Sequence, residues 1–322
     1  MNIRKVRIQT GARLHFGPLS FRVKVGPEFG GLGMTICNPG FEVTLETSST
    51  DEIQSSDDLK QPIQKIVADV RRKLEVEDSH GIHIKVLRAI PRHVGLGSGT
   101  QLGLAVAKGV AVLLGFEKLS ITDLARLAGR GRRSAIGIHG FQQGGLLVDE
   151  GKEGDDEIGS LSRRLDFPED WRVLLVIPKD RQGIFGEREG AVFDYIKPME
   201  SSTSAELRAL IETTIIPSVE RCEFENFASA LTSYGKIVGA YFSRYQGGVF
   251  SIPNASKVCD ILDSHGVFGY GQSSWGPTLW VLQRSEQQAT ALEKVLSRNP
   301  VFREFQFRVV KPLNTGAQIE LI

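Results

Sequence analysis

Cysteine is scarce in this sequence, and long apolar runs are missing from it. The three cysteines, Cys37, Cys222 and Cys259, lie far apart without a CxxC pair, which excludes a zinc site based on spacing and favours buried, reduced thiols. No run of about 18 consecutive apolar residues occurs, so we expect no membrane-spanning helix. The N-terminal residues also lack the apolar stretch of a signal peptide. We therefore expect a cytoplasmic protein.

An excess of charge of either sign is missing as well. The chain has 39 Lys and Arg residues against 38 Asp and Glu residues, so its formal net charge is +1. A balanced chain has no overall field to attract nucleic acid or anionic lipid, so we expect neither partner and only a local anion site. Hydrophobic residues make up 41% of the 322 positions, which favours a large folded core over disorder. At ~150 residues per domain, this length predicts about two domains.

A polar stretch at residues 150–166 shows no periodicity and is the best candidate for a domain boundary. It gives predicted domains 1–165 and 166–322. The elements predicted before it are strands near 6–8 and 41–45 around a glycine-rich turn region at 26–40, a helix at 61–74, a strand at 81–91 and an apolar helix at 102–115. Because this last helix is apolar nearly all round, we expect it to be central in its domain.

The second half restarts with a strand and predicts helices on a mainly antiparallel sheet, which is an α+β fold class. The predicted elements are a strand at 171–178, helices at 204–219 and 222–243, a helix from about 254, a strand at 278–283, a helix from Ser285 and a strand at 305–311. Two helix starts carry capping signals: Ser120 with Asp123, and Ser285 with Gln288.

The strongest local signal is the glycine-rich segment PRHVGLGSGTQ at residues 91–101, between a predicted strand and a predicted helix. Such a loop brings backbone N–H groups to the positive end of a helix dipole, which makes a phosphate-binding cradle. It lacks the GK[ST] ending of a Walker A loop and the spacing of a Rossmann loop. A turn that merely connects strand and helix is the alternative. The residues expected to bind phosphate are Gly95, Gly97, Ser98, Gly99 and Thr100.

This loop resembles the P-x-x-x-G-L-G-S-[SG] motif of the GHMP kinase superfamily. The segments ARLHF and GYGQSSWGPTLWVL are similar to the first and third motifs of that superfamily and occur in the same order. The resemblance covers essentially the whole chain. It implies a two-domain fold, with an N-terminal domain like domain 2 of ribosomal protein S5 and a ferredoxin-like C-terminal domain. One departure is Gly137, which stands where many of these kinases have an Asp base and cannot accept a proton.

A closer resemblance is to the β-ribofuranosylaminobenzene 5′-phosphate synthase family within this superfamily. It rests on GRGRRSAIGIHGFQQGGLLVDEG, FENFASALTSYGKIVGAYFSRYQGG and GYGQSSWGPTLW. The resemblance implies a glycosyltransferase of tetrahydromethanopterin biosynthesis that joins 4-aminobenzoate (or 4-hydroxybenzoate) to phosphoribosyl pyrophosphate (PRPP) and releases CO2 and pyrophosphate. With it we expect Mg2+, no organic cofactor and a homodimer. PRPP binding rests on this resemblance alone, because the paired-acid signature of ordinary phosphoribosyltransferases is missing.

PRPP carries two anionic groups, so the resemblance requires two anion sites. The glycine-rich loop could supply one, and its Ser98 is the candidate ligand for Mg2+. A basic run could supply the other through bidentate contacts, with a solvated surface run as the alternative; it consists of Arg130, Arg132 and Arg133. Further basic candidates, each with the alternative of an ordinary surface charge, are Arg13, Lys24 and Arg92.

The catalytic candidates come from the other motif segments: His15, His139, Gln272 and Ser273. The two histidines could titrate near neutrality, with a hydrogen-bonded structural role as the alternative. Trp275, with Ser274 beside it, could stack on the aminobenzoate ring or be a core residue between the domains. The implied reaction needs little acid–base chemistry, because the protein has to neutralise pyrophosphate and hold the ring against C1 of the ribose.

Two other functions stay open at this point. One is an ATP-dependent small-molecule kinase that uses the same loop for ATP phosphates, and the other is a ligand sensor on a kinase-like scaffold. Gly137 argues against a kinase with an Asp base, and the intact loop argues against a purely structural protein. The residues do not distinguish 4-aminobenzoate from 4-hydroxybenzoate.

Overall fold

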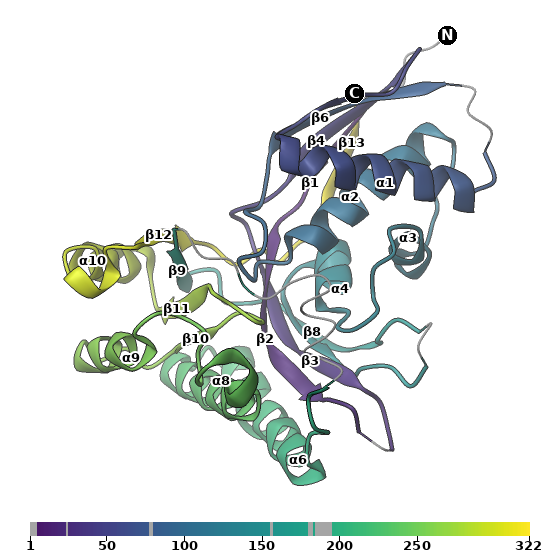
Figure 1. Ribbon diagram of the computed structural model, residues 1–322. Coiled ribbons are helices and arrows are strands. Elements are labelled where there is room, and N and C mark those ends of the chain that lie inside the picture. Colours follow the sequence, from purple (N-terminus) through teal and green to yellow (C-terminus); the bar gives the residue numbers. More distant parts are fainter. Residues whose placement is uncertain (1–4, 24, 77–79, 155–156, 180–182, 184–194) are drawn as a thin grey trace.

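The chain is organised by three sheets with helices packed on them (Figure 1). The computed structural model describes residues 5–23, 25–76, 80–154, 157–179, 183 and 195–322. Within these residues no helix is both long and apolar enough to cross a bilayer.

The first sheet has the order β13-β1-β4-β6-β5 and is antiparallel except for the β5–β6 pair. Helix α2 (Ser98–Leu113) packs on β1 and β4, and α1 (Asp57–Lys73) packs beside α2. Helix α2 is buried nearly all round, which confirms its predicted central place. The strands are β1 (Lys5–Gln9), β4 (Glu42–Ser48), β5 (Glu52–Gln54), β6 (Gly81–Arg88) and β13 (Gln318–Leu321).

The second sheet has the order β2-β3-β7-β8 and overturns one prediction, because β3 forms within the region expected to be turns. Its glycines serve close packing: an added Cβ at Gly33 would lie 2.5 Å from Cγ2 of Ile136 in helix α4. The strands and helices of this part are β2 (Ala12–Ser20), β3 (Phe29–Ile36), β7 (Leu146–Asp149), β8 (Leu161–Leu165), α3 (Ile121–Leu127) and α4 (Ile136–Gln143).

The third sheet is antiparallel, with the order β10-β11-β9-β12, and its helices confirm the predicted α+β arrangement. Its strands are β9 (Arg172–Pro178), β10 (Tyr270–Gln272), β11 (Leu279–Gln283) and β12 (Phe305–Val310). The helical segments are α6 (Ser201–Leu210), a π-helix (Ile211–Ile215), α7 (Ile216–Glu220), α8 (Phe224–Gln246), α9 (Ala255–Ser264), α10 (Glu286–Leu296) and a 3₁₀ turn (Pro300–Phe302). Helix α8 packs on both β10 and β2, so it joins the two halves.

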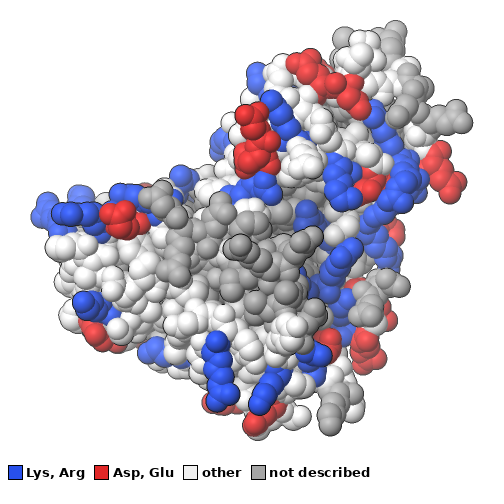
Figure 2. Space-filling view, viewed as in Figure 1, with Lys and Arg blue, Asp and Glu red and all other residues white. Residues whose placement is uncertain are grey.

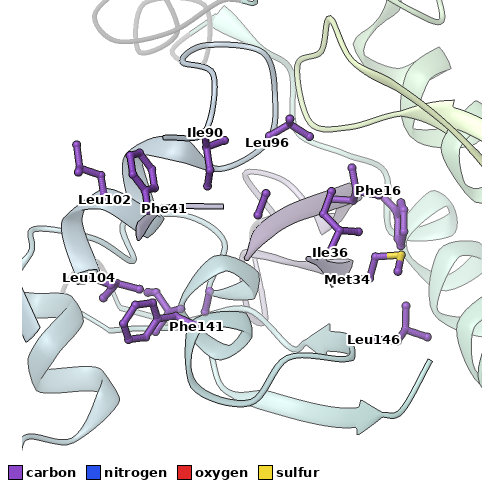
Figure 3. Close-up of a cluster of buried hydrophobic side chains, with 14 of the residues drawn as sticks. Phe16, Met34, Ile36, Phe41, Ile90, Leu96, Leu102, Leu104, Phe141 and Leu146 are labelled. Carbon is purple, nitrogen blue, oxygen red and sulfur yellow. The ribbon is translucent and has the colours of Figure 1, made fainter. Parts of the chain in front are cut away.

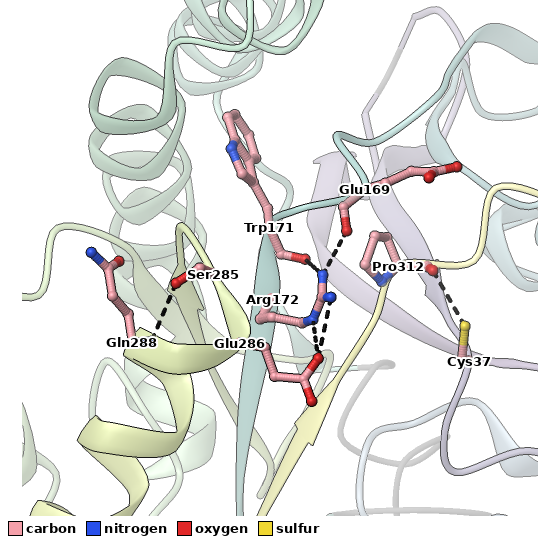
Figure 4. A network of polar contacts seen from close by, with 8 residues as sticks. All are labelled: Cys37, Glu169, Trp171, Arg172, Ser285, Glu286, Gln288 and Pro312. Atoms are coloured by element: carbon pink, nitrogen blue, oxygen red, sulfur yellow. Dashed lines mark hydrogen bonds and ion pairs between the residues drawn. The ribbon is translucent and has the colours of Figure 1, made fainter.

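Both predicted caps are present. The backbone N–H of Asp123 donates to Oγ of Ser120 at 3.1 Å, and that of Gln288 donates to Oγ of Ser285 at 3.3 Å. The start of α10 is also tied to β9 by the largely buried Arg172, whose Nη2 donates to Oε2 of Glu286 at 3.3 Å (Figure 4).

The last strand returns to the first half of the chain. Strand β13 pairs with β1, and the carbonyl of Pro312 accepts a hydrogen bond from Sγ of Cys37 at 3.3 Å (Figure 4). The predicted boundary near residue 165 falls between β8 and β9, but the segment after β12 packs with residues 1–165 rather than with its own half. The main apolar core is likewise shared: it includes Phe16 and Leu104 (Figure 3) and also Trp280 of β11.

Candidate active site

A cavity of about 320 Å³ lies where the two halves meet. It is enclosed by β2, the start of α2, the loop at 129–134, helix α8 and the turn at 272–275. Its polar lining residues are Arg13, His15, Thr100, Arg130, Arg132, Arg133, Ser134, Gln246, Gln272 and Ser274. Its apolar lining includes Phe16, Phe21, Phe29, Gly235, Val238, Gly239, Phe242, Val249, Phe250 and Trp275.

The glycine-rich loop opens α2 as the sequence predicted. Gly97 is the N-cap residue, with φ 74°, and its carbonyl accepts hydrogen bonds from the N–H groups of Thr100 and Gln101. This left-handed backbone favours glycine. An added Cβ at Gly95 would lie 2.5 Å from the carbonyl oxygen of Ser273, so the loop also packs tightly on the turn at 272–275.

Arg13 and Arg130 lie on either side of the start of α2. An added Cβ would lie 2.6 Å from Cγ of Arg13 at Gly97, and 3.4 Å from Nη1 of Arg130 at Gly99. Burial, together with the nearby charges of Arg132 and Arg92, lowers the pKa of Arg130. Its buried Nε has no hydrogen-bond partner among the described residues. A cation at the positive end of a helix is electrostatically unfavourable, so this arrangement favours a bound anion.

The cavity lining is cationic on one side. Four arginines line it, and its described lining residues include no Asp or Glu. Figure 2 shows Lys and Arg side chains gathered over the part of the molecule that contains α3 and α4. Buried Asp149 fixes the loop that carries three of these arginines, since it accepts hydrogen bonds from the N–H groups of Ala135 at 2.6 Å and Gly151 at 2.9 Å. The chain can therefore hold a ligand with several negative charges here.

The cavity lining also contains a row of aromatic rings in mutual contact, the aromatic wall, formed by Phe29, Phe21, Phe242 and Trp275. The ring centroids are 5.7 Å apart for Phe29 and Phe21, 5.9 Å for Phe21 and Phe242, and 4.9 Å for Phe242 and Trp275. Such edge-to-face and tilted contacts hold the rings in fixed positions. This wall suits the face of an aromatic ligand.

His15 lines the cavity at a bulge of β2, two residues after Arg13 and next to Phe16 in the sequence. Burial, and then the charge of Arg13, lower the pKa of His15 to about 3. The side chain is therefore neutral near neutrality, which corrects the expectation that it titrates there. Its Nε2 is buried without a hydrogen-bond partner in the described part of the chain.

Comparison with known proteins adds the family. Residues 61–145 match the N terminal domain family of GHMP kinases. The β-ribofuranosylphenol 5′-phosphate synthase of Methanothermobacter thermautotrophicus is 31% identical over 291 residues, covering 85% of this chain and 87% of that protein. The synthase of the same name from Archaeoglobus fulgidus is 30% identical, over 98% of this chain and 100% of that protein. The chain belongs to this synthase family. It is therefore an enzyme, a transferase of ribose phosphate.

The fold of this synthase family member is similar to that of a solved structure. The crystal structure of homoserine kinase from Cytophaga hutchinsonii matches it with a TM-score of 0.65 at 17% identity, over 99% of this chain and 98% of that one. The GHMP kinase fold predicted from the three motifs is thereby confirmed.

Several predicted site residues of the synthase lie outside the cavity lining. His139 contacts the carbonyl oxygen of Gly159 through Nε2 at 2.8 Å, and buried Ser273 donates to the carbonyl of Gly95 at 2.7 Å. Arg92 pairs with Asp58 at 3.7 Å. The structure thus places these three side chains against neighbouring protein groups, outside the described lining of the cavity.

The other predicted residues divide between the lining and its supports. Gln272 and Ser274 line the cavity, and Gln272 accepts hydrogen bonds from Ser251 through Oε1 and donates to the carbonyl of Ser274. Gly95, Gly97, Ser98 and Gly99 form the loop behind the lining, where only Thr100 of the predicted loop residues is exposed to the cavity. Lys24 lies outside the described residues.

Sequence reasoning missed the contribution of α8 and of two phenylalanines. Gly235, Val238 and Phe242 of α8 line the cavity, as do Phe21 and Phe29. Their helical or apolar pattern is that of ordinary core residues, so no local signal marks them. The resemblance of the α8 segment to the family was the available clue.

Proposed function

We propose that this enzyme transfers the 5-phosphoribosyl group of PRPP to 4-hydroxybenzoate and releases CO2 and pyrophosphate. The observation that carries the proposal is the cavity lining, which combines an aromatic wall with four arginines, two of them beside the start of α2. PRPP is a polyanion and the acceptor is a flat ring, so the two sides match the two substrates. The names of the curated relatives, which describe a ribofuranosylphenol product, favour a phenolic acceptor over 4-aminobenzoate.

The donor occupies the arginine side in this proposal. Arg130 and the N-terminal turn of α2 bind one anionic group, and Arg132 and Arg133 bind the other. The charge that develops on departing pyrophosphate is then met by groups already in place, which is the largest contribution a protein makes to such a step. Thr100 is positioned to add a hydroxyl donor.

The acceptor lies on the aromatic wall, with one ring carbon facing C1 of the ribose. The bond between C1 and the pyrophosphate oxygen breaks, and the oxygen keeps the electron pair. The ring carbon that bears the carboxylate, para to the hydroxyl, forms the new bond to C1. The bond to the carboxylate then breaks, CO2 leaves, and its electron pair restores aromaticity. No proton has to be removed from the ring, so the lack of a base at Gly137 does not hinder the reaction.

Mg2+ belongs to the substrate in this proposal. No group of three or more His, Cys, Asp or Glu side chains that could hold a metal occurs within the described residues. Ser98, the expected ligand, is flanked by glycines packed against Arg13 and Arg130, and this cationic set does not fit an ion that prefers carboxylate and phosphate oxygens. We therefore expect Mg2+ to arrive bound to the oxygens of PRPP.

A kinase reaction is less well supported. An added Cβ at Gly137 would lie 3.1 Å from Cγ2 of Thr100, so this position faces the loop but carries no carboxylate. The described lining residues offer no other carboxylate as a base.

The compartment and the oligomeric state are further parts of the proposal. The free thiols Cys37, Cys222 and Cys259 favour the reducing cytoplasm. Strand β13 forms an edge of the first sheet with Ile319 and Leu321 exposed, which favours pairing with a second copy. Light scattering should give the mass of a dimer, and Leu321→Lys should give monomers.

The reaction is tested with PRPP, Mg2+ and carboxyl-labelled 4-hydroxybenzoate. We expect labelled CO2 and pyrophosphate in equal amounts, and none without PRPP. A parallel assay with 4-aminobenzoate compares the two acceptors. If the folded protein releases no CO2 above the PRPP-free control, or forms ADP from ATP in an acceptor-dependent way, the transferase proposal is wrong.

A further inference from the structure

Gly235 lies in the interior of α8, where a missing side chain needs an explanation. The helix runs over 23 residues, and Gly235 is buried in it and lines the cavity. Glycine destabilises a helix interior relative to alanine, because it loses more backbone entropy on folding. A reason must therefore exist for its place at this position.

Packing supplies such a reason for the next glycine of α8 but not for Gly235. An added Cβ at Gly239 would lie 2.4 Å from the carbonyl oxygen of Val249, so only glycine fits there. At Gly235 the added Cβ would contact only Cζ2 of Trp280 among the described residues, at an ordinary 3.9 Å. The fold therefore accepts alanine at position 235.

The lining residues of α8 nearest to Gly235 are apolar. Val238 and Phe242 follow Gly235 on the same lining face of α8, and Trp280 behind it packs edge-to-face on Phe16 at 5.1 Å. The arginines come from β2 and the loop at 129–134 instead. A side chain at position 235 would thus take space from a flat apolar ligand rather than from phosphate groups.

We infer that Gly235 is a specificity-determining residue that leaves room for the ring of the aromatic acceptor. The inference rests on the proposed function for the identity of that acceptor. The residue at position 235 determines how large a ring the apolar part of the cavity can hold. It does not affect the binding of PRPP, which occurs at the arginine side.

The test compares Gly235→Ala and Gly235→Leu with wild-type enzyme by calorimetry and by steady-state kinetics. We expect Gly235→Ala to weaken 4-hydroxybenzoate binding roughly 10-fold, since a methyl group in a filled pocket costs about that much. Gly235→Leu should abolish it. The PRPP dissociation constant should change less than twofold, and the melting temperature of Gly235→Ala should not fall. Ser233→Ala, on the exposed side of α8, is the matched control and should change nothing.

Other outcomes would overturn the inference. Unchanged acceptor affinity in Gly235→Leu places the ring elsewhere, and an equal loss of PRPP affinity means that position 235 serves the whole cavity. A lower melting temperature for Gly235→Ala assigns the glycine to packing. Calorimetry needs no turnover, so a wild-type protein that binds 4-hydroxybenzoate without releasing CO2 refutes the proposed reaction while the inference about Gly235 is still decided. A wild-type protein that binds no 4-hydroxybenzoate overturns both.

Discussion

The two sides of the cavity are built in opposite ways. The arginine side consists of Arg13 of β2 and of loops whose shape depends on glycines with positive φ, among them Gly97 and Gly131. The aromatic side is a long helix and a set of rings in mutual contact. On the first side, the buried Nε of Arg130 has no hydrogen-bond partner among the residues that the structure describes, whereas the rings on the second side already pack on one another.

This difference indicates how the two substrates are held. A polyanion supplies what the arginine side needs, so most of the binding free energy should come from that side. The aromatic side offers shape and a ring face, each worth less but selective for the acceptor. Substitutions on one side should therefore change the affinity for one substrate only, and the predictions below test this in order of decreasing effect on binding.

The largest effect is expected for Gly97→Val. The left-handed φ of 74° disfavours a β-branched residue. The new Cβ would lie 2.6 Å from Cγ of Arg13, so the side chain of Arg13 would have to move. We expect PRPP binding to weaken at least ~100-fold and stability to fall by about 1–2 kcal/mol. Gly115→Val is the control, because Gly115 also has positive φ (89°) but has open space around it. If calorimetry gives both variants the same PRPP affinity, the loop does not shape the donor site.

Arg130→Ala should have the next largest effect. Charge-assisted hydrogen bonds contribute about 1.5–3 kcal/mol, so PRPP affinity should fall roughly 10- to 100-fold, while 4-hydroxybenzoate affinity stays within about twofold. Arg130→Lys should recover only part of the loss if the contact is bidentate. Arg126→Ala is the control, since Arg126 pairs with Asp123 on the surface at 3.1 Å. If calorimetry gives Arg130→Ala the same PRPP affinity as the wild type, Arg130 has a structural role and does not bind PRPP.

Local signals in the sequence predicted much of the fold. The caps at Ser120 and Ser285 and the periodic helices formed as expected. Strand β3 was missed because its glycines allow α4 to approach, and that contact is not encoded near residue 33. Strand β13 was missed because its partner β1 lies at the other end of the chain.

The same limit applies to the site. The loop at 95–100 and the arginines at 130–133 are continuous motifs, so the sequence could point to them. The aromatic wall joins Phe21, Phe29 and Phe242 from distant segments, and each of them looks like a core residue. His139 and Ser273 lie within the motifs, yet their side chains bond to backbone carbonyls, because proximity in sequence does not fix where a side chain points.

Trp275→Leu should produce a smaller effect, and it should weaken the binding of 4-hydroxybenzoate rather than that of PRPP. Loss of the aromatic pair with Phe242 and of the ring face should cost about 0.5–1.5 kcal/mol, or roughly 2- to 12-fold in 4-hydroxybenzoate affinity. The PRPP dissociation constant should stay within about twofold. Phe268→Leu, an exposed ring, serves as control. A loss of PRPP affinity as large as that for the acceptor, seen by calorimetry, would mean that the two sides do not act separately.

His15 should have the smallest effect on binding. Its pKa in the folded protein is about 3, below the ordinary 6.5, so it stays neutral at pH 5.5–8, and its titration should change neither substrate affinity by more than about twofold there.

The effect of His15 on stability should depend on pH. As the pH falls from 6.5 towards 3, the unfolded chain gains a proton at His15 that the folded chain does not, so this residue lowers stability by up to ~1.4 kcal/mol per pH unit. Urea unfolding at several pH values should show a slope between pH 6 and 4 that is smaller by this amount in His15→Gln than in wild type. An equal slope in both proteins would mean that His15 has the same pKa in the folded and the unfolded chain, and the arginine side would then gain a fifth cation below about pH 6.5.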